Sequence, residues 1–239
     1  MKILALIAVL ALSVVPRLRA EPTQGVVKPF RTIFVPSPVL QEIISEIHVE
    51  EGTEVRKGQV LVQLRADRET LDVKLSEKLI ELKRFIAAGQ EKLYQEKMGS
   101  EEKAREARTE LEISVLQLEA KKVALEEKTI RATMDGVIVK KFKEAGEAVD
   151  RAEKLLEMMN YDQVIVEFYI KPELRKNVKQ NDKVRVRFLD LDNSEIEGRV
   201  DLVDPRNDSA SSLVRIKVLV DNQDHRIKPG MKSMAEFGK

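Results

Sequence analysis

The feature that most constrains this chain is a long segment, residues 67–128, that contains no proline and is dense in charge. It holds 15 acidic and 13 basic residues among 62, and no proline occurs between Pro38 and Pro172. Its apolar residues recur at steps of three and four, the spacing of a coiled-coil seam. The first half offers one such seam, made of Leu71, Leu75, Leu79, Leu82, Ile86 and Leu93. The second half offers another, made of Ala104, Ala107, Leu111, Val115, Leu118 and Leu125.

A break between the two halves predicts a turn. At Met98-Gly99-Ser100, Gly99 suits a left-handed conformation that ends a helix, and Ser100 suits the position before a new helix. Glu101 and Glu102 follow, where negative charge stabilises a helix N-terminus. Two helices joined by so short a turn must run antiparallel, each roughly 40–50 Å long at about 1.5 Å per residue. The segment is therefore predicted to form an antiparallel helical hairpin.

The sequences on either side of this hairpin are related to each other. Residues 42–64 and 136–158 align at an offset of 94, and each reads as a strand, a Glu-x-Gly turn, a valine and a short aliphatic strand. The matched pairs are Ile44/Ile138, Glu50/Glu144, Gly52/Gly146, Val55/Val149 and Leu61/Leu155. Gly52 and Gly146 fit turn positions that need positive φ, and Gly58 and Gly230 are further turn candidates. Since neither half can bury both faces of its strands, the two are expected to pack as one flattened β-sandwich.

A second group of strands follows. Residues 164–170, 184–188, 196–200 and 214–218 alternate between apolar and polar side chains, a short helix is expected to begin at Pro172, and Pro229-Gly230-Met231 forms a turn. Asn181 stands before the second of these strands and tolerates the positive φ of a turn. The pattern predicts a separate β-domain after residue 160.

Paired V-x-x-G-x-x-V-x-x-G-x-x-L-like halves split by a coiled coil resemble the lipoyl domain of periplasmic adaptor proteins. These are the membrane fusion proteins of the HlyD/RND-adaptor superfamily. The later strands, with Gly198-Arg199-Val200 and the Pro-Gly-Met turn, are similar to the family's β-barrel domain. The resemblance implies a mixed α and β fold: a lipoyl-like β-sandwich interrupted by an antiparallel coiled-coil hairpin and followed by a small β-barrel. The implied division is 21–35 for a strand joining the barrel, 36–65 with 129–159 for the lipoyl-like domain, 66–128 for the hairpin and 160–239 for the barrel.

Residues 1–20 predict an export signal. After Lys2, an apolar run over residues 3–15 ends at Pro16. The run is shorter than the roughly 20 residues that span a bilayer, and its length matches the apolar region of a signal peptide. Ala20 suits a cleavage site, while Arg17 and Arg19 leave an uncleaved N-terminal anchor as the alternative.

The amino-acid composition excludes several common kinds of catalytic and metal site. The chain has no Cys and two histidines, His48 and His225, which excludes disulfides, thiolate metal sites and cysteine nucleophiles. A net charge of +1 argues against nucleic acid as a partner. No catalytic, cofactor or metal-binding residue is predicted, and both histidines are expected at the surface. Four methionines leave a metal-ligand alternative to core packing: Met158, Met159, Met231 and Met234.

The resemblance implies a non-catalytic periplasmic adaptor that forms homo-oligomers and links an inner-membrane transporter, of RND or ABC type, to an outer component of an efflux or secretion system. An outer-membrane channel is a further candidate partner. The Arg-x3-Leu-x6-Ser pattern by which such adaptors meet TolC-type channels is absent, since counting from Arg84 gives Ala88 and Gln95. The alternative is a lipoyl or biotin carrier or a stand-alone envelope scaffold, although the hairpin replaces the turn that would present the modified lysine.

The outward contact is predicted at the hairpin tip. Apolar and aromatic groups gather there with little seam left to cover them, and such groups at the end of a rigid lever are good anchors for a partner. The predicted contact residues are Leu93, Tyr94, Met98, Gly99, Ser100 and Glu101. The competing interpretation is that Leu93 and Tyr94 only close the last layer of the coiled coil.

Overall fold

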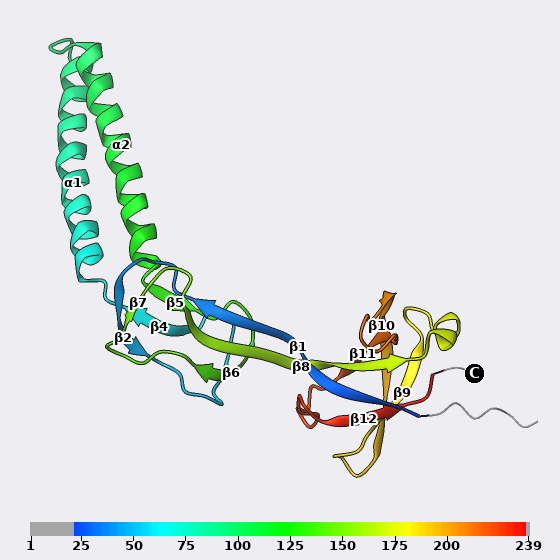
Figure 1. The fold of residues 1–239 in the computed structure, drawn as a ribbon. Helices are drawn as coiled ribbons and strands as arrows, with labels where there is room; N and C mark the ends of the chain where they lie inside the picture. The colour runs from blue at the N-terminus through cyan, green and yellow to red at the C-terminus, as the bar shows by residue number, and fades with distance from the viewer. Residues whose placement is uncertain (1–21, 238–239) are drawn as a thin grey trace, which may run out of the picture. The chain divides into compact units, whose positions relative to one another are not determined.

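The computed structural model describes residues 22–237, which form two compact units. One unit is Pro29–Asp162, and the other joins the described residues up to Lys28 with those from Gln163 onward. Two long strands, β1 (Thr23–Pro36) and β8 (Lys154–Ile170), contribute residues to both units (Figure 1). The predicted signal peptide or anchor, residues 1–20, lies outside the described residues. Among residues 22–237, no helix has both the length and the apolar character needed to cross a membrane.

The first unit contains a β-sandwich in two layers. One layer is a sheet of four strands in the order β5-β4-β2-β7, and in the other β6 pairs with β3 and with the start of β8. The bounds are β2 (Glu42–Ile47), β3 (Glu54–Val55), β4 (Val60–Leu64), β5 (Thr129–Arg131), β6 (Gly136–Lys141) and β7 (Ala148–Val149). Each layer therefore takes strands from both sequence halves.

The two related halves interlock with an approximate twofold symmetry. The Gly52 N–H donates a hydrogen bond to the Ile138 carbonyl oxygen (2.8 Å). Its counterpart at the offset of 94, the Gly146 N–H, donates to the Ile44 carbonyl oxygen (2.9 Å). This reciprocity confirms the prediction that the halves form one sandwich.

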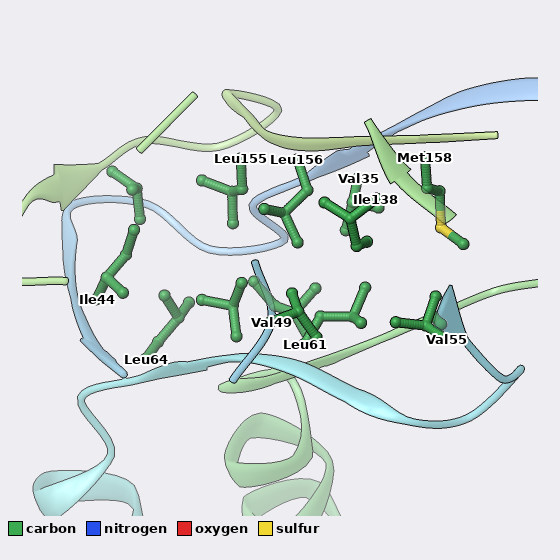
Figure 2. Close-up of a cluster of buried hydrophobic side chains, with 14 residues drawn as sticks. Val35, Ile44, Val49, Val55, Leu61, Leu64, Ile138, Leu155, Leu156 and Met158 are labelled. Carbon is green, nitrogen blue, oxygen red and sulfur yellow. The ribbon is translucent and has the colours of Figure 1, made fainter. Parts of the chain in front are cut away.

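Side chains from both halves fill the core of the sandwich. Figure 2 shows aliphatic side chains of the two layers pointing toward one another. Members of the core are Val35, Ile44, Val49, Val55, Leu61, Val62, Leu64, Ile130, Ala132, Ile138, Val149, Leu155, Leu156 and Met158. None of them comes from the segment between residues 67 and 126.

That segment forms two helices, α1 (Asp67–Gln95) and α2 (Glu101–Glu126), that run antiparallel from one end of the sandwich (Figure 1). At about 1.5 Å per residue they are about 43 and 39 Å long, so α1 falls within the predicted 40–50 Å and α2 just below it. The hairpin follows β4 and precedes β5, so it is inserted between the two halves of the repeat.

The second unit is a closed β-barrel. Its strand order is β1-β12-β9-β10-β11-β8, and a further pairing between β1 and β8 closes the order on itself. The remaining bounds are β9 (Lys183–Phe188), β10 (Ser194–Asn207), β11 (Val214–Asp221) and β12 (Lys232–Ala235), with a 3-10 helix at Pro172–Asn177. Alternate residues of β9 and β11, such as Val186 and Ile216, are fully buried. Asn181 has the positive φ expected of it, +72°.

We predict that the sandwich folds without its hairpin. In a chain whose residues 67–126 are replaced by a short glycine-containing turn, every core residue of Figure 2 is retained. Such a chain should therefore keep a β-type circular dichroism spectrum and a cooperative thermal transition. An unfolded spectrum would contradict the assignment of 36–65 and 129–159 to one domain.

Candidate partner-binding hairpin

The hairpin tip is a hydrogen-bonded turn centred on Lys97. The Lys97 N–H donates to the Tyr94 carbonyl oxygen (2.9 Å) and the Met98 N–H to the Leu93 carbonyl oxygen (2.8 Å), the two bonds of a Schellman motif. Lys97 carries the left-handed φ of +59°, so the expectation that Gly99 would do so is wrong. A Cβ added to Gly99 would instead make a tight contact, 3.0 Å from the Leu93 Cβ.

The side chains predicted to contact a partner lie together in this turn. Leu93 and Tyr94 are each 39% exposed and Met98 is 69% exposed, so the end of the hairpin presents apolar and aromatic surface. Ser100 occupies the position before α2 as expected, although its side chain forms no capping hydrogen bond. Glu101 begins α2 and is exposed.

The seam predicted for α1 is wrong. Its leucines lie outside the helix pair: Leu71, Leu75 and Leu82 are 64%, 70% and 54% exposed. The more buried side of α1 instead carries Val73, Ser76, Ile80, Lys83, Ala87 and Gln90. This second set also steps by three and four, so both sets have coiled-coil spacing and the sequence alone could not separate them. The face bearing Val73 and Ile80 packs inward.

The seam predicted for α2 is correct except at one position. Ala104 and Ala107 are buried, and Leu111 and Leu118 are half-buried. Val115 is exposed, and Ser114 takes its place, with its hydroxyl donating to the Glu110 carbonyl oxygen at 2.9 Å. Small side chains therefore make much of the α2 seam. Small side chains allow two helices to approach closely. A close approach leaves less room for leucines between the helices than the sequence-based seam requires.

Four ion pairs join the two helices. They are Lys83 Nζ–Glu110 Oε2 (2.5 Å), Arg108 Nη2–Glu91 Oε2 (2.6 Å), Lys121 Nζ–Asp72 Oδ2 (3.0 Å) and Lys122 Nζ–Glu77 Oε1 (3.8 Å). Exposed pairs of this kind contribute roughly 0–1 kcal/mol each, so they add little to the stability of the hairpin.

A more buried ion-pair group holds the root of the hairpin. Lys128 follows α2, and its ammonium is 2.5 Å from a Glu42 carboxylate oxygen and 3.1 Å from one of Glu69. The Lys128 side chain is 8% exposed. Its carbonyl oxygen also accepts the Leu64 N–H at 2.8 Å. Because Glu42 belongs to β2 and Glu69 to the first turn of α1, Lys128 ties both helices to the sandwich.

Both members of the closest pair have shifted pKa values. Burial opposes ionisation of Glu42, but the hydrogen bond from Lys128 and the Ile43 N–H outweigh it, so the Glu42 pKa lies below 4.5. Burial likewise opposes the charge of Lys128, and the bonds to Glu42 and Glu69 outweigh it, so the Lys128 pKa lies above 10.5. The pair is therefore ionised at neutral pH.

The predicted turn glycines all adopt left-handed backbone. The φ angles of Gly52, Gly58, Gly146 and Gly230 are +88°, +86°, +90° and +96°. Ala152, which aligns with Gly58 at the offset of 94, has a φ of +63°. The second half thus makes the same turn without a glycine.

Three residues bear on the alternative chemistries: His48, Met158 and Lys141. His48 is exposed and its Nδ1 lies 3.8 Å from Glu46 Oε2, and Met158 is fully buried in the sandwich core. No group of three His, Cys, Asp or Glu side chains suited to a metal occurs among residues 22–237. Lys141, within β6, is engaged by Glu50 (2.8 Å) and Glu144 (3.2 Å) and is not presented on a turn.

A polar hollow in the barrel unit contains charges that are already paired. It is lined by Tyr169, Asp204, Arg206, Asn207, Asp208, Ser209 and Arg215. The Arg215 guanidinium is 2.9 Å from Asp204 Oδ2, and Asp208 accepts the Ser211 N–H at 2.8 Å. These contacts satisfy the acids internally, and we assign no ligand to the hollow.

A split sandwich that carries a helical hairpin, together with a closed barrel, defines the architecture of membrane fusion proteins. Residues 32–160 match the family described as CzcB-like, barrel-sandwich hybrid domain, and residues 164–239 match the CusB-like, beta-barrel domain. The chain belongs to the CzcB-like barrel-sandwich hybrid family.

Individual proteins and structures agree with this assignment. The cobalt-zinc-cadmium resistance protein CzcB of Cupriavidus metallidurans is 24% identical over 209 residues, which are 81% of this chain and 40% of that protein. The chain thus spans less than half the length of this curated relative. A MacA-MexA chimera with the Pseudomonas aeruginosa MexA hairpin has a TM-score of 0.79 at 16% identity, covering 92% of this chain and 79% of the chimera. The membrane fusion protein Spr0693 of Streptococcus pneumoniae has a TM-score of 0.73 at 13% identity, covering 92% and 100%. The two structures show the shared fold.

Proposed function

We propose that this chain is a non-catalytic periplasmic adaptor subunit of a tripartite efflux or secretion system. It would bind an inner-membrane transporter of RND or ABC type and reach toward an outer component with its hairpin. The observation that carries the proposal is the hairpin itself, inserted where a carrier domain would have its modified turn and ending in exposed Tyr94 and Met98.

Export and substrate belong to the same proposal. The apolar run at residues 3–15 supports delivery to the periplasm and association with the inner membrane. The names of the matched relatives, a cobalt-zinc-cadmium resistance protein and a cation efflux system protein, support divalent cations as the first substrates to test. The readout is the growth of a host with and without the gene in rising Co²⁺, Zn²⁺ and Cd²⁺.

The tip contact is tested by cross-linking in cells. Because the chain has no native cysteine, Tyr94→Cys, Met98→Cys and Glu101→Cys each introduce a single reactive thiol. With a thiol-reactive cross-linker these variants should form an adduct with an outer-membrane or other envelope protein, identified by mass spectrometry. Arg84→Cys, on the shaft of α1, is the matched control and should not. Equal labelling along the hairpin, or none at its tip, would reject the tip as the contact site.

The carrier alternative has its own test. Intact mass of the chain purified from its host distinguishes the two functions, because a lipoyl or biotin group on a lysine adds a defined mass. The adaptor proposal predicts no such adduct.

A further inference from the structure

Methionine supplies all the sulfur of this chain. There are seven Met and no Cys, and there is also no Trp. An oxidant that reaches the protein therefore meets no thiol, and the thioether sulfur of Met is its first target. Which Met reacts depends on exposure, because a buried thioether is shielded from an oxidant dissolved in water.

One methionine differs from the others in exposure. Met98 is 69% exposed, and it is the only exposed methionine among residues 22–237. Met158 is fully buried in the sandwich core. The remaining four in this range are half-buried: Met134, Met159, Met231 and Met234. The Met231 Sδ also accepts the Lys228 N–H at 3.3 Å, which engages one of its lone pairs. Of the described thioethers, that of Met98 is therefore the most accessible to a soluble oxidant.

Met98 lies where a change in polarity alters the tip surface. Its N–H donates to the Leu93 carbonyl oxygen at 2.8 Å, which is the outer bond of the Schellman turn at the end of α1. In that motif the side chains at these two positions commonly pack together. Tyr94, next to Leu93, is 39% exposed, so Met98 belongs to the apolar and aromatic group at the tip. A chemical change at its side chain therefore acts on the surface predicted to contact a partner.

Oxidation converts Met98 from an apolar to a polar side chain. A lone pair on Sδ attacks one oxygen of hydrogen peroxide, the O–O bond breaks and an S–O bond forms. The sulfur loses two electrons, and the other peroxide oxygen leaves as water after proton transfer. The sulfoxide oxygen is a hydrogen-bond acceptor, so burying it against a partner without a donor costs free energy. The sulfoxide is therefore a poorer anchor than the thioether.

We propose that Met98 is a modification site, oxidised by peroxide to methionine sulfoxide before a partner covers it, and that the modified tip binds its envelope partner less tightly. The loss of binding rests on the proposed function, in which the tip is the contact surface. The oxidation does not, because it needs only the exposed thioether. Specific reductases return methionine sulfoxide to methionine, so the change is reversible.

The oxidation is tested on the purified full-length chain. The chain is treated with hydrogen peroxide, either folded or unfolded in urea, and peptide mass spectrometry follows the oxygen gained by each methionine. In the folded chain Met98 should react about 10-fold faster than Met158, and faster than each half-buried methionine. In urea the rates should converge, which identifies exposure as the cause. Methionine sulfoxide reductases with dithiothreitol should remove the oxygen from Met98. A folded chain in which another methionine of residues 22–237 reacts first would overturn the site.

The loss of binding is tested by photo-cross-linking in cells. Benzoylphenylalanine is introduced at Glu101, and the yield of partner adduct is compared with and without peroxide, once mass spectrometry has shown Met98 to be oxidised. The yield should fall about 10-fold, the size expected when a buried contact gains one unpaired polar group. The matched control carries Met98→Leu, which cannot form a sulfoxide. Each chain is compared only with itself, and in Met98→Leu peroxide should leave the yield unchanged.

The failure of this inference and that of the proposed function give different results. If no adduct forms before peroxide is added, the tip is not the contact surface, and the binding half of the inference falls with it. A yield that falls equally in both chains, or in neither, would overturn the control of binding by Met98 and leave the tip contact standing.

Discussion

Replacing Lys128 with methionine is expected to lower the free energy of unfolding by about 3 kcal/mol, because removing one partner of a buried ion pair leaves the other charge uncompensated. In the variant, the carboxylates of Glu42 and Glu69 lose the ammonium group of Lys128, whose side chain is only 8% exposed in the native chain. Methionine matches the apolar stem of lysine as far as Cε and lacks only the ammonium, so the loss reports mainly on charge. Urea denaturation of the full chain at about pH 7, followed by circular dichroism, measures it.

Two further variants isolate the cause. Lys121→Met removes another cross-element pair, with Asp72, but that lysine is 48% exposed and should cost less than about 1 kcal/mol. Glu42→Gln/Lys128→Met removes one of the two stranded charges, that of Glu42, and should recover part of the loss. If Lys121→Met and Lys128→Met were equally destabilising, burial of the root group would not matter.

The same pair predicts a pH dependence. The folded pKa of Glu42 is lowered from 4.5, so its stabilisation is present above that value and is lost as pH falls through the folded pKa. Lys128 has a raised pKa, so its contribution is present below 10.5 and is lost as pH rises through the folded value. In Lys128→Met, protonation of the stranded carboxylates at acidic pH removes their penalty. The difference between the two chains should therefore narrow from about pH 7 to about pH 3.5, and a constant difference would contradict the assigned ionisation.

The sandwich was predictable because the same strand-turn-strand pattern occurs twice in the sequence. The pairs Ile44/Ile138 and Gly52/Gly146 mark equivalent places in two halves, and two incomplete halves have one way to complete each other. The hairpin was predictable for its length and direction, since both depend on the proline-free segment and on the turn before α2. The root group was not, because Lys128 and Glu42 are 86 residues apart and no local pattern links them.

The rotation of α1 could not be read from the sequence, because two apolar sets with coiled-coil spacing compete on that helix. The leucine set offers the greater apolar area, which by itself favours turning that set inward. The α2 seam, with Ala104, Ala107 and Ser114, favours close approach instead. At the tip, the expectation of a left-handed Gly99 rests on the intrinsic preference of glycine for that conformation. The Schellman hydrogen bonds place that conformation at Lys97.

Gly136→Ala is expected to lower the free energy of unfolding by about 2–3 kcal/mol. A Cβ on Gly136 would lie 2.3 Å from the Met159 carbonyl oxygen and 2.9 Å from its carbon, and these backbone atoms have no rotamer through which to move away. Moving β8 to make room would disturb its pairing with β6, where Val137 faces Met159, and would displace the fully buried Met158. The sequence gives no sign that Gly136 is needed, because it lies at the start of a strand and not in a recognisable turn motif. Its φ is not positive, so the requirement comes from the neighbouring strand alone.

The matched control is the same substitution in the hairpin. A Cβ on Gly89 meets nothing within 4 Å, and Gly89 lies inside α1. Gly89→Ala should therefore raise the stability of the helix by about 0.5–1 kcal/mol, because alanine is the better helix former. Both changes in the free energy of unfolding are measured by urea denaturation of the full chain. A loss for Gly136→Ala and a gain for Gly89→Ala would establish that the close approach of the β8 backbone is what requires glycine at position 136. A neutral Gly136→Ala would mean that β6 and β8 are not held as closely as the structure places them.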